Sequence, residues 1–291
     1  MKLKRYQLPS RHEGVAFRAA VVADLHDRPY DKILPLLEAA HLDLILIPGD
    51  LTEALTPAAA GRPRPGLSLL RHCAAIAPTF YALGNHEIGG CHGAIRRAKR
   101  AGTRPSPFVL DEGYASEIRE SGATLVRGEP IRWGNITLAS LESGLLNPGW
   151  IPDLSAADAL ASSPGYRLLL CHHPEYYARY LAGHDIDLIV AGHAHGGQWR
   201  LFGRGVYAPD QSLFPKYTGG VHDDRLVISR GVANSVHPIP RLLNPCEVVL
   251  LEVGIKKNAV PSNDGTAFSF CTQLSARRLS LSLARSLRRI R

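Results

Sequence analysis

The chain has 291 residues, of which 45% are hydrophobic, and this is enough for one large domain or two small ones with a sizeable core. Its net charge of +8 does not indicate a nucleic-acid-binding face, because six arginines lie in the last fifteen residues and their removal leaves about +2. The first twenty residues lack the apolar stretch of a signal peptide, and no apolar run reaches transmembrane length.

The first half of the chain alternates apolar runs with more helical stretches. Val15–Ala23 is followed by Tyr30–Ala40, and Leu42–Pro48 is followed by Leu67–Ile76. This alternation is typical of βαβ units, which form a parallel sheet. Lys2–Leu8 is a candidate edge strand.

After Glu120 the pattern changes to strands joined by short turns. The expected strands are Ala123–Val126, Ile131–Glu142, Arg167–Cys171, Ile186–Ala191, Leu226–Ser229 and Cys246–Val253. They favour a second, more antiparallel sheet. We therefore predict an α/β fold, in the form of a two-sheet mixed β-sandwich flanked by helices. The catalytic domain would cover residues 1–254, and a basic tail would cover residues 255–291.

Four motifs with metal-binding side chains each follow an apolar run. They are Asp24-Leu25-His26, Gly49-Asp50, Gly84-Asn85-His86-Glu87 and Gly192-His193-Ala194-His195. A lone Asp24 or Asp50 at a strand end is more often a turn former or a helix cap, whereas Gly-Asn-His-Glu and Gly-His-Ala-His are more specific signals. Four in succession at strand ends predict that the side chains gather at one edge of the sheets. Because carboxylates and imidazoles suit adjacent divalent ions that activate water, the pattern predicts a two-metal hydrolase.

The order of these motifs, with a further histidine before the last, resembles the signature of the calcineurin-like metallophosphoesterases over about Val15–Val253. The resemblance implies two divalent ions, which are manganese, iron or zinc. It implies the metal ligands Asp24, His26, Asp50, Asn85, His172, His193 and His195. Asp24, His26 and His195 would bind one ion, Asp50 would bridge, and the others would bind the second ion.

The same resemblance implies a reaction. A hydroxide bridging the two ions, generated with the help of Asp50, would attack a phosphomonoester, a phosphodiester or a pyrophosphate. His86 would act as the catalytic acid or base. A narrower likeness, in the residues from Gly192 to Gln198 and from Arg241 to Pro245, is to bacterial UDP-diacylglucosamine pyrophosphohydrolase-like enzymes.

The choice of the later histidine rests on a proline. In Leu170-Cys171-His172-His173-Pro174, the family's histidine precedes the proline by two positions, so we take His172 as the ligand. His173 remains a second candidate.

Two basic features near the motifs are candidates for substrate binding. Many family members continue Asp-x-His with Leu-Gly, whereas this chain has Asp27-Arg28-Pro29, and the guanidinium of Arg28 suits a phosphate as well as it suits a surface turn. The stretch from Ile88 to Arg104 carries five basic residues and no acid after Glu87, and it is either a cationic loop at the site or a solvated helix face. Gly203–Gly220, rich in glycine and proline, is expected to shape the rim of the site.

The tail has a basic amphipathic pattern. Leu279, Leu283, Leu287 and Ile290 would share one helix face, with arginines on the other. Such a helix lies on anionic membranes, although a disordered tail or a helix docked on the domain fits the pattern too.

The compartment and the partners follow from these features. Five cysteines, an odd number with no Cys-x-x-Cys pair, indicate a reduced, cytoplasmic compartment, with the tail allowing peripheral contact with the inner face of the membrane. The expected partner is a phosphorylated small molecule or a lipid-linked substrate. The alternatives are a non-catalytic metal-binding scaffold of the same fold, and a nuclease, for which the charge distribution gives little support.

Overall fold

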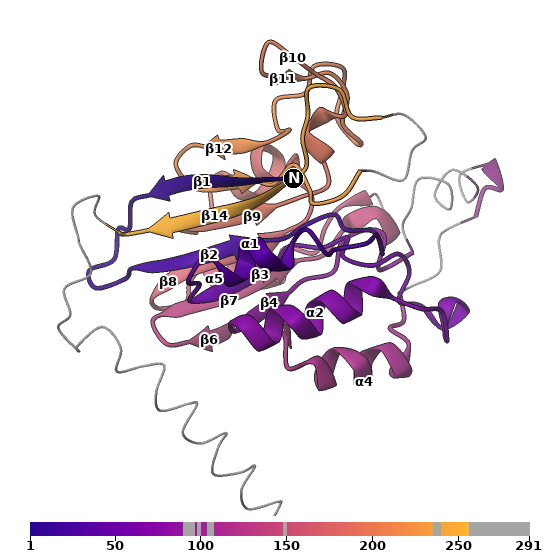
Figure 1. Ribbon diagram of the computed structural model, residues 1–291, viewed down its shortest axis with the longest axis horizontal. Helices are drawn as coiled ribbons and strands as arrows, with labels where there is room; N and C mark the ends of the chain where they lie inside the picture. Colours follow the sequence, from indigo (N-terminus) through magenta and orange to yellow (C-terminus); the bar gives the residue numbers. More distant parts are fainter. Residues whose placement is uncertain (90–96, 98–99, 104–107, 148–149, 235–239, 256–291) are drawn as a thin grey trace, which may run out of the picture. The chain divides into compact units, whose positions relative to one another are not determined.

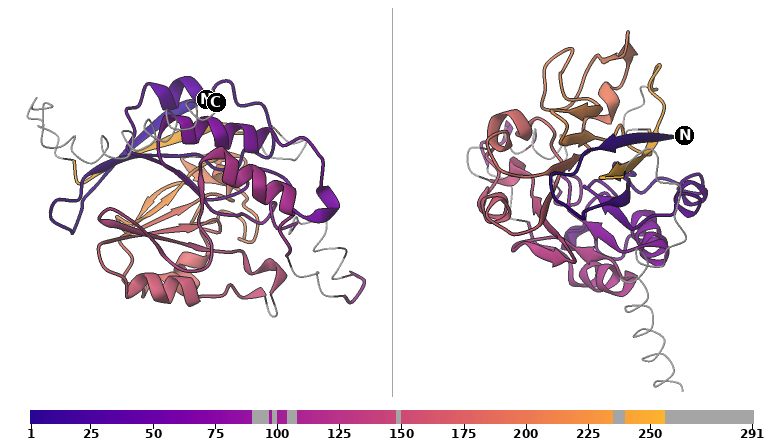
Figure 2. Two further views of the ribbon diagram at one scale, coloured as in Figure 1. Left: turned by 90° about the horizontal axis from the view of Figure 1, so that it is seen from below. Right: turned by 90° about the vertical axis from the view of Figure 1, so that its left-hand side faces the viewer.

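Two six-stranded sheets lie face to face, with helices on their outer sides (Figures 1 and 2). The computed structural model describes residues 1–89, 97, 100–103, 108–147, 150–234 and 240–255. Residues 1–255 form one compact unit. The tail from Lys256 onward and most of the basic stretch 88–104 lie outside the described residues. Within the described part, no helix has both the length and the apolar character needed to cross a bilayer.

The first sheet contains most of the expected parallel strands. Its order is β1 (Lys2–Leu8), β14 (Glu247–Val253), β2 (Phe17–Val21), β3 (Leu44–Ile47), β4 (Thr79–Tyr81) and β5 (Thr124–Leu125). β2 to β5 run parallel, β14 is antiparallel to β2, and β1 is the expected edge strand, parallel to β14.

The second sheet corrects one expectation. Its order is β12 (Gly220–His222), β13 (Leu226–Ile228), β9 (Leu188–Ala191), β8 (Tyr166–Cys171), β7 (Ile136–Leu141) and β6 (Ile131–Trp133). The expectation of a more antiparallel sheet holds only at its edges: the β12–β13 and β6–β7 pairs are antiparallel, whereas β13, β9, β8 and β7 run parallel. Two of the strands assigned to it, β5 and β14, belong to the first sheet instead.

Alternating side chains build three apolar layers from these sheets. On β3, Leu44 and Leu46 point between the sheets, where they join Leu168 and Leu170 of β8. The alternate residues of β3 point outward and pack under the helices of the first sheet. A third layer lies under the helix of the second sheet. Because each sheet is covered on both faces, its central strands are fully buried, as the continuous apolar runs predicted.

The helices are short and cover the outer faces. α1 (Leu34–Glu38), α2 (Pro65–Ile76) and α4 (Glu112–Ser121) contribute to the layer outside the first sheet, and α5 (Ser155–Ala161) contributes to the layer outside the second. α1 is much shorter than the stretch Tyr30–Ala40 suggested. Single-turn elements are η1 (Pro57–Ala59), η2 (Gly144–Leu146), η4 (Tyr177–Leu181) and η5 (His195–Gly197). A small hairpin of β10 (Arg200–Leu201) and β11 (Arg204–Gly205) projects beyond the sheets (Figure 1). The α/β two-sheet architecture is thus the predicted one.

Candidate metal centre

The candidate ligands follow the carboxyl ends of parallel strands in both sheets. Asp24, Asp50 and Asn85 come after β2, β3 and β4 of the first sheet. His172 and His193 come after β8 and β9 of the second. The two sheets therefore supply ligands to one place from opposite sides, which explains why the motifs are interleaved along the chain.

The backbone turns sharply where these side chains leave the strands. Left-handed φ angles of 46° to 64° occur at Asp24, His26, Asp50, His193 and His195. This conformation is uncommon for residues other than glycine, and it is retained where surrounding contacts hold it. Two such contacts are the hydrogen bonds from the Asp24 amide to the Gly49 carbonyl and from the His26 amide to the Asp50 carbonyl, at 3.2 and 3.0 Å.

One group of three side chains contains Asp24, His26 and His195, whose ligand atoms lie within 4.8 Å of one another. The Asp24 carboxylate is fully buried, and its Oδ2 makes no hydrogen bond to any described residue. In the same part of the chain, neither ring nitrogen of His26 makes a well-aligned one. Burial raises the pKa of Asp24 and lowers that of His195 well below its usual value. Buried polar atoms of this kind fit a cation that would take the place of hydrogen-bond partners.

A second group contains Asp50, His172 and His193, again within 4.8 Å. The Nδ1 of His172 lies 3.2 Å from the Pro48 carbonyl, which can only accept, so Nδ1 carries the proton. Its Nε2 lies 3.0 Å from Asp50 Oδ2. Against the effect of burial, the charge of Asp50 raises the pKa of His172 to about 9, so without a metal Nε2 is protonated as well, and a bound cation would take the place of that proton. A histidine fixed through its other nitrogen is the usual arrangement for a metal ligand.

Asp50 belongs to the second group and also faces the first. The same oxygen that faces His172 is 3.8 Å from Nε2 of His26, which belongs to the first group. Although burial opposes it, the neighbouring histidines, His172 first, lower the pKa of Asp50 well below its usual value. The position suits a carboxylate shared by two cations. Asn85 is also buried, and it is the candidate ligand that follows β4 of the first sheet.

His86 lies beside the centre rather than in either of these groups. Its amide donates to Asp50 Oδ1 at 2.9 Å, and its ring lies edge-on to that of His26, with 4.5 Å between centroids. Its Nδ1 is 2.8 Å from Oε2 of Glu53. Against the effect of burial, the charges of Asp50 and Glu53 and the hydrogen bond to Glu53 raise the pKa of His86 to about 10.

Glu53 is a site residue that the sequence motifs did not indicate. Besides its contact with His86, its Oε1 lies 3.4 Å from Nδ1 of His26. Despite its partial burial, the close contacts with these two histidines lower the pKa of Glu53 to about 2. In the sequence, Glu53 is marked only by its position three residues after Asp50. That position does not predict a contact with His86, because the contact depends on the pairing of β3 with β4.

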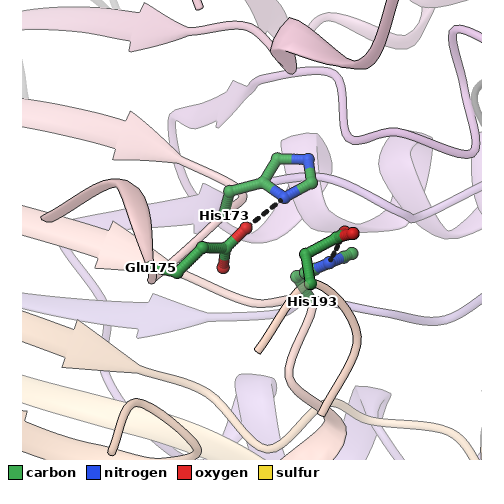
Figure 3. A group of neighbouring side chains, drawn as sticks. His173, Glu175 and His193 are labelled. Atoms are coloured by element: carbon green, nitrogen blue, oxygen red, sulfur yellow. Dashed lines mark hydrogen bonds and ion pairs between the residues drawn. The ribbon is translucent and has the colours of Figure 1, made fainter. Parts of the chain in front are cut away.

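The structure places His172, and not His173, beside Asp50. Both nitrogens of His173 are engaged, Nδ1 with Glu175 at 2.9 Å and Nε2 with the Ser143 hydroxyl at 2.8 Å. Figure 3 shows His173, Glu175 and His193 as neighbours. His193 in turn lies 3.1 Å through its Nε2 from Asp210 Oδ2, a second residue that was not anticipated.

Glu87 joins the two turns that carry Asp50 and Asn85. Its buried carboxylate accepts hydrogen bonds from the amides of Asp50, Thr52 and Gly84 and from the Tyr81 hydroxyl, at 2.7 to 3.0 Å. The two glycine turns are closely packed, because a Cβ on Gly84 would lie 2.2 Å from Asp50 Oδ1. A Cβ on Gly49 would lie 2.6 Å from Gly84.

The basic candidates lie at the surface or outside the described part. Arg28 is exposed, two residues after His26. In the stretch 88–104, Arg97 and Arg100 are exposed, and the other basic residues lie outside the described residues. The choice between a cationic loop and a solvated helix face therefore remains a prediction.

The chain is similar to known proteins over most of its length. Residues 17–197 match the family described as Calcineurin-like phosphoesterase. A metallophosphoesterase of Caenorhabditis elegans is 27% identical over 86% of this chain and 50% of its own length. An uncharacterized metallophosphoesterase of Campylobacter jejuni is 28% identical over 80% of this chain and 56% of its own length. This chain thus spans about half the length of these relatives. Among solved structures, a Pseudomonas putida nuclease is 16% identical, covers 76% of this chain and 80% of its own, and has a TM-score of 0.32.

Proposed function

Because the chain belongs to the calcineurin-like phosphoesterase family, in which hydrolysis depends on metal ions, we propose that it cleaves a phosphoester or pyrophosphate bond at a binuclear centre. The observation that supports two ions is the position of Asp50, whose Oδ2 faces histidines of both groups. A single carboxylate between two sets of buried donors is what a shared ligand requires.

The ligand assignment follows the two groups. Asp24, His26 and His195 would hold one divalent ion, and His172, His193 and Asn85 would hold the other, with Asp50 shared. The mixture of carboxylate, imidazole and amide suits manganese, iron or zinc. Bound there, two such ions would lower the pKa of water and neutralise phosphoryl oxygens.

His86 and Glu53 supply the proton chemistry of this proposal. Glu53 accepts from Nδ1 of His86 and fixes the ring, which leaves Nε2 to hold a proton for the leaving oxygen. This is the role that the Asp partner plays for histidine in other hydrolytic sites, where it orients the imidazole and stabilises its charge.

The proposal is tested by metal removal. Dialysis against a chelator is expected to abolish turnover of generic phosphomonoester, phosphodiester and pyrophosphate substrates. Added Mn²⁺ is expected to restore turnover. Elemental analysis should then find close to two equivalents of manganese bound per chain. One bound equivalent at full activity would contradict the binuclear centre. Metal binding without turnover of any substrate would favour the scaffold alternative.

Removing His86 tests its role and that of Glu53 together. We expect His86→Ala to lower kcat by roughly a hundredfold or more, as for loss of a general acid or base. We expect Glu53→Gln to lower kcat less, because the imidazole remains but is held less firmly. The double variant should be close to His86→Ala in rate if Glu53 acts through His86, and a further loss would report its contact with His26. Additive losses in a kinetic double-mutant cycle would show that Glu53 acts independently.

Arg28 is proposed to contact the substrate phosphate. It is exposed in the loop that follows His26, and a guanidinium donates to two phosphoryl oxygens at once. Arg28→Ala is expected to raise KM by about tenfold with little change in kcat, if it binds substrate and transition state alike. An unchanged kcat/KM would remove Arg28 from the site.

A further inference from the structure

Large apolar side chains gather on the loops that follow η5. Of eleven exposed large hydrophobic residues in the described part of the chain, eight lie in this region. They are Trp199, Leu201, Phe202, Tyr207, Leu213, Phe214, Leu242 and Leu243. We call this set the apolar rim. Phe202 is the most exposed, at 103% of its reference area. Single exposed hydrophobics need no explanation, but a cluster of this kind marks an interaction surface.

Backbone hydrogen bonds join the loops of the apolar rim into one unit. Trp199 and Leu242 form a bridge, and the Arg200 amide donates to the Leu242 carbonyl at 3.0 Å. On the other side of the hairpin, the Phe214 amide donates to the Val206 carbonyl at 2.9 Å. The β10–β11 hairpin, with Phe202 in its turn, projects beyond both sheets (Figure 1). The apolar rim therefore lies on connected loops, of which the β10–β11 hairpin projects beyond the sheets.

Three of the exposed residues of the apolar rim have an unfavourable backbone conformation. Phe202, Phe214 and Leu243 have φ angles of 49°, 53° and 53°. Bulky residues rarely adopt this conformation, and residues 1–255 give these three side chains little burial in return. A binding partner that covers them would supply the missing burial.

The apolar rim borders the metal centre directly. The Asn244 side chain donates to the His195 carbonyl at 2.7 Å, immediately after Leu243. Arg241, immediately before Leu242, places Nη2 3.2 Å from Nδ1 of His195. Asp210, between Tyr207 and Leu213, bonds His193. Whatever covers the apolar rim is thus brought next to the candidate ligands.

We propose that the apolar rim docks on an anionic lipid bilayer. Aromatic rings with a polar edge, such as those of Trp199 and Tyr207, suit the boundary between headgroups and acyl chains. Arg204 and Lys216 are exposed in the same stretch, residues 199–220, and its one acid, Asp210, lies 3.1 Å from His193. The surplus of positive charge complements anionic headgroups. A projecting hairpin with an exposed phenylalanine in its turn suits insertion between lipids better than capture of a helix, which requires a groove.

Docking of this kind goes beyond the proposed hydrolysis and does not depend on it. It would hold the metal centre at the headgroup level of a membrane. It also differs from the tail hypothesis, because it uses residues of the catalytic unit.

The experiment is co-sedimentation of the full chain with vesicles of phosphatidylcholine, with and without phosphatidylglycerol. The double variant Phe202→Ser/Phe214→Ser is expected to lower the partition coefficient for the anionic vesicles by at least about tenfold, the effect of losing one buried apolar side chain or more. Ile151→Ser is the matched control, because Ile151 is 52% exposed and lies outside the apolar rim, and its binding should equal that of the parent.

Binding through the tail and self-association of the chain are distinguished from docking by two more measurements. A full chain with Arg285, Arg288 and Arg289 changed to glutamine reports on the tail. The proposal is overturned if only this variant loses binding. It is also overturned if the double variant binds vesicles like the parent, or if it changes only the oligomeric state in size-exclusion chromatography. Thermal unfolding of the double variant should match the parent, and binding is measured without substrate, so an inactive protein would not affect the result.

Discussion

Changing Asp50 to asparagine is expected to lower kcat/KM for a soluble phosphodiester by about a thousandfold or more, since cation stabilisation of the transition state contributes several kcal/mol. One oxygen of Asp50 lies 3.0 Å from His172 and 3.8 Å from His26. An amide in its place offers one weak acceptor and no charge, so it cannot serve two cations. The measurement is turnover in saturating Mn²⁺, together with bound metal after desalting.

The matched control for this substitution is Asp224→Asn. Asp224 is exposed and has the same left-handed φ of 52° as Asp50, so any effect of asparagine on such a turn is reproduced there. Its kcat/KM should equal that of the parent. Asparagine tolerates this backbone region, so Asp224→Asn should unfold at the temperature of the parent. Without metal, Asp50→Asn should unfold at a lower temperature, because it loses the charge that pairs with His172. Turnover of Asp50→Asn within tenfold of the parent would sink the assignment of Asp50 as the shared ligand.

Truncating Glu87 is expected to have the largest effect on stability. Glu87→Ala leaves three buried amides and the Tyr81 hydroxyl without their acceptor, and it opens a cavity under the centre. We expect the free energy of unfolding to fall by about 3 to 5 kcal/mol, as when one member of a buried charged network is removed. The measurement is urea denaturation in excess chelator, so that a loss of bound metal does not contribute.

Two milder variants calibrate this result. Glu87→Gln keeps one acceptor oxygen and nearly the same volume, so it should cost less than Glu87→Ala. Tyr81→Phe removes a single donor to Glu87, and we expect it to cost about 1 kcal/mol. If Glu87→Ala cost no more than Tyr81→Phe, the backbone amides would not depend on Glu87.

Many of the strands could be predicted from the sequence, because a strand buried on both faces requires a continuous run of apolar residues. β3 reads Leu-Ile-Leu-Ile, and all four residues are buried, as expected of a strand covered on both faces. The sheet to which a strand belongs is not a local property. β14 pairs with β1 and β2, more than 220 positions away in the sequence. No residue near β14 predicts that pairing. The parallel centre of the second sheet was missed for the same reason, since strand direction depends on the connections.

At the metal centre, the sequence determined the kinds of side chain and their order, because each motif is a short polar segment directly after a buried strand, and three of the four begin with glycine. Tertiary structure decided which atoms face one another. The Pro48 carbonyl orients His172, and Ser143 and Glu175 engage His173. Glu53 and Glu87 acquire their roles only from partners on other strands and turns. The apolar rim follows the same division: its residues can be read in the chain, but exposure is a property of the folded surface, which depends on what every other segment leaves uncovered.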